Sequence, residues 1–243
     1  MKMNQKPSMI LFDYGLTLLC EPDFEPLRGD RVLSQFITKN PNHVSVEDIS
    51  ACARRIFLSA EAARAAGFEM HEHALLRLLN DSLGLEYSIS LEEQEWLFWE
   101  NASTAEPMPQ VEMLLEYLHA ASIRTAVVSN ISFSEHALKR KIDTALPNNH
   151  FEFVLASSEY GVRKPNPLIF QAALQRARVA PEDAWFCGDN FETDIKGAAA
   201  AGIFPVWYHE ESCRQDLTGQ EGQPLDYFQV SQWQDLIDFV KKF

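Results

Sequence analysis

The apolar and polar positions of this 243-residue chain change their spacing twice along its length. Residues 9–13 are four apolar side chains followed by an aspartate, the pattern of a buried strand that ends at the edge of a sheet. From residue 27 to residue 99, apolar side chains recur at helical spacing, as at Leu75, Leu76 and Leu79. Because no strand-like alternation interrupts this second stretch, we expect it to be entirely helical.

The helical stretch also carries boundary signals. Asp81, Ser82 and Gly84 are typical of a helix end, and Ser90 before two glutamates is typical of an N-cap with an acidic first turn. We expect Ile56 and Leu58 to be apolar anchors of an earlier helix in this stretch.

Beyond residue 106, short apolar runs alternate with amphipathic stretches. Together with the first run, the predicted strands cover residues 9–13, 124–128, 151–155, 185–187 and 204–207. The predicted helices cover residues 111–121, 134–142, 167–177, 193–201 and 231–242. Strands that alternate with helices form a parallel sheet with right-handed crossovers. The predicted fold class is therefore α/β, a doubly wound, Rossmann-like parallel sheet over residues 1–20 and 106–243, with an inserted α-helical domain over residues 21–105.

Composition narrows the range of partners. The net charge of −14 argues against nucleic acids and anionic membranes, because phosphate surfaces require a basic face. No apolar run approaches the roughly 20 residues of a membrane helix, and the first residues lack the apolar stretch of a signal peptide. The cysteines are widely separated, which indicates neither a disulfide framework nor a zinc site: Cys20, Cys52, Cys187 and Cys213. We expect a cytoplasmic protein, and the sequence specifies no oligomeric state.

Polar residues that could form an active site lie at or just after the ends of the predicted strands. The polar residues there are Asp13, Ser129, Asn130, Lys164, Asp189 and Asp194. The carboxyl ends of parallel strands converge on one crevice, so these side chains can meet. Three carboxylates in one crevice repel one another, and a divalent cation together with the Lys164 ammonium would balance them. Oxygen ligands with retained waters suit Mg²⁺, and the remaining space would take one phosphate, with Ser129 and backbone N–H groups as donors.

Four segments, read in order, resemble the motifs of the haloacid dehalogenase-like hydrolase superfamily. They are Phe12–Leu18 (FDYGLTL), Val127–Asn130 (VVSN), Gly161–Pro167 (GVRKPNP) and Gly188–Ala198 (GDNFETDIKGA). The resemblance is to the phosphatase-like branch with a helical cap inserted after the first motif, and the predicted helical insert falls where that cap would fall. It implies a Mg²⁺-dependent phosphohydrolase that acts on a small phosphorylated metabolite.

The resemblance also implies roles for single residues. Asp13 would be the nucleophile that forms an aspartyl-phosphate. Asp194 would hold a metal-bound water or orient Lys164, and the cap would close over the site and select the leaving group. The implied catalytic residues are Asp13, Ser129 and Lys164. The implied substrate-binding residues are Gly15, Thr17, Ser129, Asn130 and Lys164. The implied metal ligands are Asp13, the backbone carbonyl of Gly15, Asp189 and Asp194.

One position departs from the family pattern. Phosphatases of this family carry a second aspartate two residues after the nucleophile, where it protonates the leaving group and then activates water. This chain has Gly15 there, so metal ligation by the backbone carbonyl survives and the acid/base group is lost. General acid–base help is worth roughly 10²–10⁴-fold in rate, so we expect slow hydrolysis of alkyl phosphates and faster hydrolysis of acyl or aryl phosphates.

Replacement acids are available in the sequence just beyond the first motif and between the cap helices. The candidates are Glu21, Asp23, Glu25, His71 and His73, and we expect each to be a solvated charge or a helix cap. A catalytically degenerate protein that binds a phosphorylated ligand is therefore an alternative function.

Carbon–halogen or carbon–phosphorus cleavage is a second alternative. Dehalogenases of the superfamily resemble a different spacing, with a tyrosine at the second position, and Tyr14 stands one residue too early for it. Phosphonatases need a cap lysine for a Schiff base. The expected cap offers Lys39, in a polar stretch that is typical of a loop.

Overall fold

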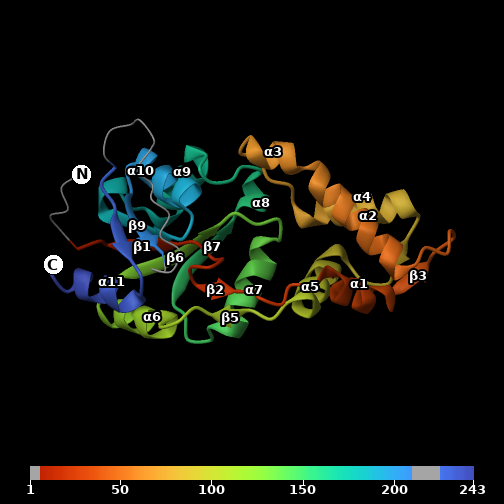
Figure 1. The fold of residues 1–243 in the computed structure, drawn as a ribbon, viewed down its shortest axis with the longest axis horizontal. Helices are drawn as coiled ribbons and strands as arrows, with labels where there is room; N and C mark the ends of the chain where they lie inside the picture. The colour runs from red at the N-terminus through yellow and green to blue at the C-terminus, as the bar shows by residue number, and fades with distance from the viewer. Residues whose placement is uncertain (1–5, 210–224) are drawn as a thin grey trace.

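The computed structural model describes residues 6–209 and 225–243. Within them, six strands form a parallel sheet in the order β10-β9-β8-β1-β6-β7 (Figure 1). The strands are β1 (Met9–Phe12), β6 (Arg124–Ser129), β7 (Phe151–Ala156), β8 (Ala184–Gly188), β9 (Phe204–Tyr208) and β10 (Phe228–Val230). Every neighbouring pair in this sheet is parallel, which confirms the predicted α/β fold class.

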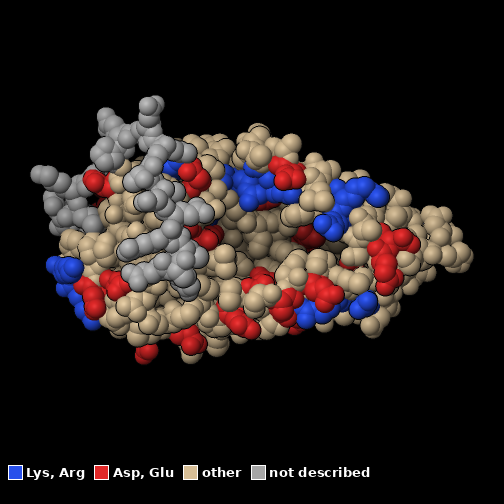
Figure 2. Space-filling view, viewed as in Figure 1, with Lys and Arg blue, Asp and Glu red and all other residues tan. Residues whose placement is uncertain are grey.

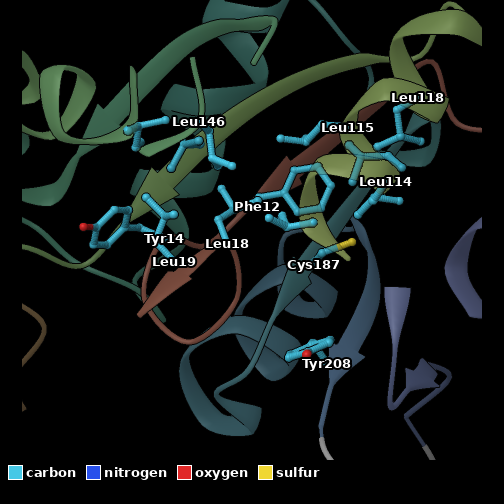
Figure 3. Packing of buried hydrophobic residues seen from close by; sticks show 14 of the residues in the cluster. Phe12, Tyr14, Leu18, Leu19, Leu114, Leu115, Leu118, Leu146, Cys187 and Tyr208 are labelled. Atoms are coloured by element: carbon cyan, nitrogen blue, oxygen red, sulfur yellow. The ribbon is translucent and has the colours of Figure 1, made fainter. Parts of the chain in front are cut away.

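Helices cover both faces of this sheet. They are α6 (Val111–Ala120), α7 (Glu135–Ala145), α9 (Pro167–Ala177), α10 (Lys196–Ala200) and α11 (Trp233–Val240). Side chains of β1 alternate between the faces, since Ile10 and Phe12 pack with α6, α7 and α11, whereas Met9 and Leu11 pack with α9 and α10. Figure 3 shows Phe12 beside Cys187, with the leucines of α6 lying over them. We call the sheet and these helices the sheet region.

Residues 26–102, which we call the helical segment, form a lobe at one end of the molecule (Figure 1). Its helices are α1 (Pro26–Ser34), α2 (Val46–Ser59), α3 (Glu61–Ala65), α4 (Glu72–Leu83) and α5 (Leu91–Ala102). The boundary signals are confirmed, because Ser90 forms a capping box with Glu93 and Gly84 ends α4 in the left-handed conformation. Ile49, Cys52, Leu75 and other buried side chains give the segment its own apolar cluster.

The expectation of an entirely helical insert is wrong. Two short strands, β3 (Ile37–Lys39) and β4 (Glu86–Tyr87), pair antiparallel inside the helical segment. Strands of three and two residues are too short to give a recognisable alternation. Lys39 therefore ends a strand instead of lying in a loop, and its Nζ atom lies 2.6 Å from Oε1 of Glu86.

Two smaller expectations also fail. Leu58 is not an apolar anchor, since it is 48% exposed while Ile56 is buried. Two residues apart on a helix are not on the same face, so both could not face the same cluster. The sheet has a sixth strand, β10, which the sequence did not indicate because Gln229 interrupts a three-residue run that has one buried side chain.

The chain leaves the sheet region and returns to it at one place. Strands β2 (Leu19–Cys20) and β5 (Glu106–Pro107) pair antiparallel there. The division into two domains stays a prediction. Two short elements, α8 (Ser157–Tyr160) and the 3₁₀ turn Pro181–Asp183, complete the connections around the sheet.

The expectations about membrane helices and cysteines are compared here with the described residues. In them, no helix is long and apolar enough to span a membrane. Cys20, Cys52 and Cys187 are free thiols, and Cys213 lies outside the described residues.

Candidate active site

The structure brings four of the predicted site residues into contact range. Nζ of Lys164 lies 2.7 Å from Oδ1 of Asp13 and 2.7 Å from Oδ1 of Asp194. Carboxylate oxygens of Asp13, Asp189 and Asp194 lie within 4.8 Å of one another. Asp13 directly follows β1 and Asp189 directly follows β8, so neighbouring strands place them at the same sheet edge. The predicted convergence of strand ends thus produces one compact cluster.

The segment after β8 places Asp194 in this cluster. Residues Phe191–Ile195 form a π-helix, and the Asn190 side chain accepts hydrogen bonds from the backbone N–H groups at its start. This wider turn carries the Asp194 side chain back over Gly188, where an added Cβ would overlap it. Only glycine fits at that position, which explains the Gly188–Asp189 pair in the sequence. π-Helical turns are rare and often occur at functional sites.

Asn130 and Ser129 lie at the end of β6. The Asn130 side chain makes two hydrogen bonds to the backbone of Lys164. Its Oδ1 accepts from the Lys164 N–H at 2.7 Å, and its Nδ2 donates to the Lys164 carbonyl at 2.9 Å. This pair of hydrogen bonds fixes the loop that carries Lys164. Ser129 is the last residue of β6 and is buried next to these groups. The side chain of Asn130 therefore supports Lys164 directly.

Gly15 and Thr17 lie in the loop between β1 and β2. An added Cβ at Gly15 would meet no atom of the described residues within 4 Å, so this part of the loop borders open space. Thr17, predicted to bind substrate, is fully buried, and its hydroxyl has no hydrogen-bond partner in the described part of the chain. The assignment of Thr17 to substrate binding stays a prediction.

Burial dominates the electrostatics of the cluster. It raises the pKa of Asp13 to about 7 against the attraction of Lys164, with Asp194 and Asp189 adding to the rise. It also raises the pKa of Asp189 to about 6. Burial alone would lower the pKa of Lys164, but Asp13 and Asp194 outweigh it and hold that pKa above its usual value.

The cluster therefore fits a hard dication. Three carboxylates share one ammonium, which leaves an excess of negative charge in a buried place. Carboxylate oxygens are the donors that Mg²⁺ prefers, and two or three of them with retained waters are enough for it.

Glu21 is not a solvated charge, contrary to the expectation. Its Oε1 accepts from the Tyr14 hydroxyl at 2.7 Å, and its Oε2 accepts from Nε1 of Trp99 at 2.8 Å and from the Ser103 hydroxyl. These partners lie far apart in the sequence, so the pattern around Glu21 gave no sign of them. The carboxylate is occupied in joining the first motif to α5.

The two histidines have structural partners. His71 caps α4, because its Nδ1 accepts from the backbone N–H of His73 at 3.0 Å. The expectation of a helix cap is confirmed there. Nε2 of His73 lies 3.1 Å from the fully buried Glu95. Of the other candidates, Asp23 pairs with Arg28 at 2.9 Å.

A cavity of about 710 Å³ lies between the helical segment and the loop after β6. It reaches Asn130 and therefore adjoins the carboxylate cluster. This face of the molecule is hollowed between the two parts, with basic side chains along one rim and acidic ones along the other (Figure 2).

Hydrogen bonds cross beside the cavity and join the two parts of the molecule. The Glu72 N–H donates to the Ser132 carbonyl at 2.8 Å, and the Ser134 hydroxyl donates to Glu95 at 2.6 Å. Glu72 and Glu95 belong to no motif, so nothing in the sequence indicated their role in joining the two parts.

Comparison with known proteins decides the family. Residues 25–202 match the family profile described as haloacid dehalogenase-like hydrolase. The chain belongs to this family. The match contains Ser129, Lys164 and the Asp189–Asp194 segment, and Asp13 precedes it.

Two curated relatives are similar over part of the chain. Phosphoserine phosphatase of Thermus thermophilus is 34% identical over 99 residues, which are 41% of this chain and 39% of that protein. Glyceraldehyde 3-phosphate phosphatase of Methanopyrus kandleri is 35% identical over 95 residues, which are 39% of this chain and 40% of that protein. The chain thus matches about two fifths of the length of these relatives.

Solved structures show the same fold over nearly the whole chain. A 2-haloacid dehalogenase from Pseudomonas syringae aligns with a TM-score of 0.60 at 21% identity, over 96% of this chain and 98% of that one. A phosphatase of the family from Thermococcus onnurineus aligns with a TM-score of 0.57 at 19% identity, over 96% and 97%. Both activities therefore occur on this fold, and the fold alone does not choose between them.

Proposed function

We propose that this haloacid dehalogenase-like hydrolase is a Mg²⁺-dependent phosphatase of a small phosphorylated metabolite. The observation that carries the proposal is Lys164, whose ammonium lies 2.7 Å from both Asp13 and Asp194 while Asp189 stands within reach. This arrangement offers a carboxylate nucleophile, a fixed positive charge and a set of oxygen donors in one place. The two curated relatives described above are both named as phosphatases, which supports phosphate as the group transferred.

The proposed reaction has two steps at Asp13. A carboxylate oxygen of Asp13 attacks phosphorus, the bond from phosphorus to the ester oxygen breaks, and the alcohol leaves after taking a proton from solvent. Water then attacks the aspartyl-phosphate, which releases inorganic phosphate and restores the Asp13 carboxylate. Lys164 and Ser129 hold the phosphoryl oxygens in both steps, and Asp194 keeps Lys164 in position.

Asp13, the carbonyl of Gly15 and Asp189 would hold Mg²⁺, with Asp194 close enough to bind it or one of its waters. When bound, the ion would neutralise phosphoryl charge and help to align the phosphate. The helical segment acts as a cap that limits water at the site and contacts the leaving group.

The test is phosphate release from acetyl phosphate and p-nitrophenyl phosphate, with Mg²⁺ and with a chelator. We expect activity with Mg²⁺ and its loss on chelation. Asp13→Asn should lower kcat/KM by roughly 10³-fold or more, because the nucleophile is gone. Asp81→Asn, an exposed change on α4, is the matched control and should keep full activity.

Three results would contradict the proposal. They are activity in Asp13→Asn within a few-fold of the unchanged protein, activity that ignores chelation, and release of halide from a 2-haloacid in place of phosphate. Tight binding of a phosphate ester without release of phosphate would favour the degenerate binding protein.

A further inference from the structure

The cavity beside Asn130 has apolar walls. Leu75, Leu76 and Leu79 line it from α4, and Phe98 and Phe133 line it from α5 and the loop after β6. Its volume of about 710 Å³ lies in the range of sites that enclose small organic molecules. A space this large and apolar exceeds what a phosphate group alone would need.

One carboxylate oxygen in this cavity is buried without a partner in the described residues. Asp30 of α1 lines the cavity and is 5% exposed, and its Oδ2 atom accepts no hydrogen bond from the described residues. Glu72 lines the same cavity, but the Ser132 hydroxyl donates to it at 3.0 Å. Burial raises the pKa of Asp30 to about 6, against a hydrogen bond from Ser50. A buried carboxylate oxygen without a partner is costly, so this position calls for a cation or a donor from outside the chain.

Three arginines line the cavity: Arg54, which is exposed, Arg64 and Arg163. Arg163 pairs with Glu69 at 3.3 Å. Arg64 lies 4.0 Å above the ring of Phe57 and donates to its backbone carbonyl at 2.8 Å, although its Nη1 atom has no hydrogen-bond partner in the described residues. In the described ranges, no lysine or arginine forms an ion pair with Asp30. The cavity therefore combines apolar and aromatic walls with an uncompensated buried acid.

We propose that this cavity binds the organic part of the substrate, and that this part is a mostly apolar group bearing an ammonium group that pairs with Asp30. The inference rests on the proposed function for the other end of the ligand, where the phosphate lies near Lys164. The aromatic walls suit the same ligand, because a cation is also attracted to the faces of aromatic rings. The substrate class is thus a phosphate monoester of an apolar amino alcohol.

Binding without phosphate tests the cavity alone. The probes are 4-phenylbutylamine, 4-phenylbutan-1-ol and 4-phenylbutanoate, titrated into the full chain by calorimetry. We expect the amine to bind about tenfold or more tightly than the alcohol, since a hydrogen bond to a buried charge contributes that much. Asp30→Asn should remove the preference for the amine and leave alcohol binding unchanged. Asp81→Asn on the surface should alter neither, and Ala53→Trp, which narrows the cavity, should weaken both.

Turnover separates this inference from the proposed function. kcat/KM is measured for 6-aminohexyl phosphate and hexyl phosphate, and we expect the aminated ester to be preferred about tenfold by the unchanged protein and not by Asp30→Asn. Equal use of both esters by both proteins would overturn the inference and leave the phosphatase standing. Asp30-dependent binding of the amine without any release of phosphate would overturn the phosphatase and leave the cavity assignment standing. Preference for 4-phenylbutanoate would assign the cavity to an anion at Arg64 and overturn the inference.

Discussion

From the resemblance of the first motif, we expect an acid at the position that Gly15 occupies. The structure shows that nothing blocks a larger side chain there, because an added Cβ meets no described atom within 4 Å. Its backbone is outside the left-handed region, so an L-residue is not strained. The missing carboxyl group is therefore a chemical difference, and neither packing nor backbone conformation imposes it.

Gly15→Asp should consequently raise activity on substrates with poor leaving groups. We expect kcat for glycerol 3-phosphate to rise by about 10²-fold or more, and kcat for acetyl phosphate to change much less, because its leaving group needs little protonation. Phosphate release by both proteins measures this. Gly15→Asn is the control, since it has the same shape without an acid. No gain from aspartate, or an equal gain from asparagine, would show that Gly15 is not the missing acid/base position.

Among single residues, the sequence predicts the positions of those that come directly after a strand. Asp13 and Asp189 were predictable because each directly follows an apolar run. The partners of Glu21 were not, because Trp99 and Ser103 reach it from across the fold. Asp30 gave no signal either, since its Oδ2 atom is buried without a partner in the described residues only once α1 lies against the cavity.

Helix α1 packs closely on α5, and Gly29 makes this contact possible. An added Cβ at Gly29 would lie 2.6 Å from the backbone oxygen of Phe98 and 2.6 Å from its ring. Backbone atoms cannot rotate away, so the helices would have to separate. The same contact positions Asp30, the next residue, and so connects helix packing with the cavity.

Gly29→Ala should therefore destabilise the protein even though alanine favours helix. Overpacking costs about 1–3 kcal/mol, and the gain in helix propensity offsets about 1 kcal/mol of it. We expect a net loss of up to about 2 kcal/mol in the free energy of unfolding, measured by urea denaturation. Arg31→Ala, at an exposed position of the same helix, should change it by less than about 0.5 kcal/mol. A more stable Gly29→Ala protein would contradict the close contact.

Elements differ in how far their sequences specify them. The long helices were predictable because several apolar positions repeat and polar residues such as Ser90 mark a start. Strands β3, β4 and β10 could not be predicted, because two or three residues are too few to show an alternation of apolar and polar side chains. These segments become strands by pairing with a neighbouring strand.

Across the whole molecule, buried glutamates join the helical segment to the sheet region. Glu72 donates through its backbone to Ser132 and accepts through its carboxyl group from the hydroxyl of the same residue. Burial raises the pKa of Glu72 to about 7, with Glu95 and Asp30 adding to the rise. No local pattern could predict this connection, because both sides of it form only after the two parts meet.

Stability should then fall as the pH rises through this range. The unfolded chain loses the Glu72 proton near pH 4.5 and the folded chain near pH 7, so the folded state binds more protons between these values. Glu72→Gln removes this dependence while it keeps an acceptor for Ser132. We expect little difference in unfolding free energy near pH 4.5 and a gain of roughly 3 kcal/mol for the variant at pH 8.

Urea denaturation between pH 4.5 and pH 8 measures the difference. Glu116→Gln, an exposed change on α6, is the matched control and should give a curve parallel to the unchanged protein. Parallel curves for Glu72→Gln as well would mean that Glu72 titrates at the same pH in both states.

The β2–β5 pair joins the stretch from residue 21 to residue 105 to the rest of the chain through two hydrogen-bonded neighbours, Leu19 opposite Pro107 and Cys20 opposite Glu106. Because both junctions lie side by side, a foreign sequence of any length whose ends are close together could be grafted there without stretching the loop between β1 and β2. Recombination at these two points would exchange residues 21–105 as one piece, while Asp13, Lys164, Asp189 and Asp194 are inherited unchanged.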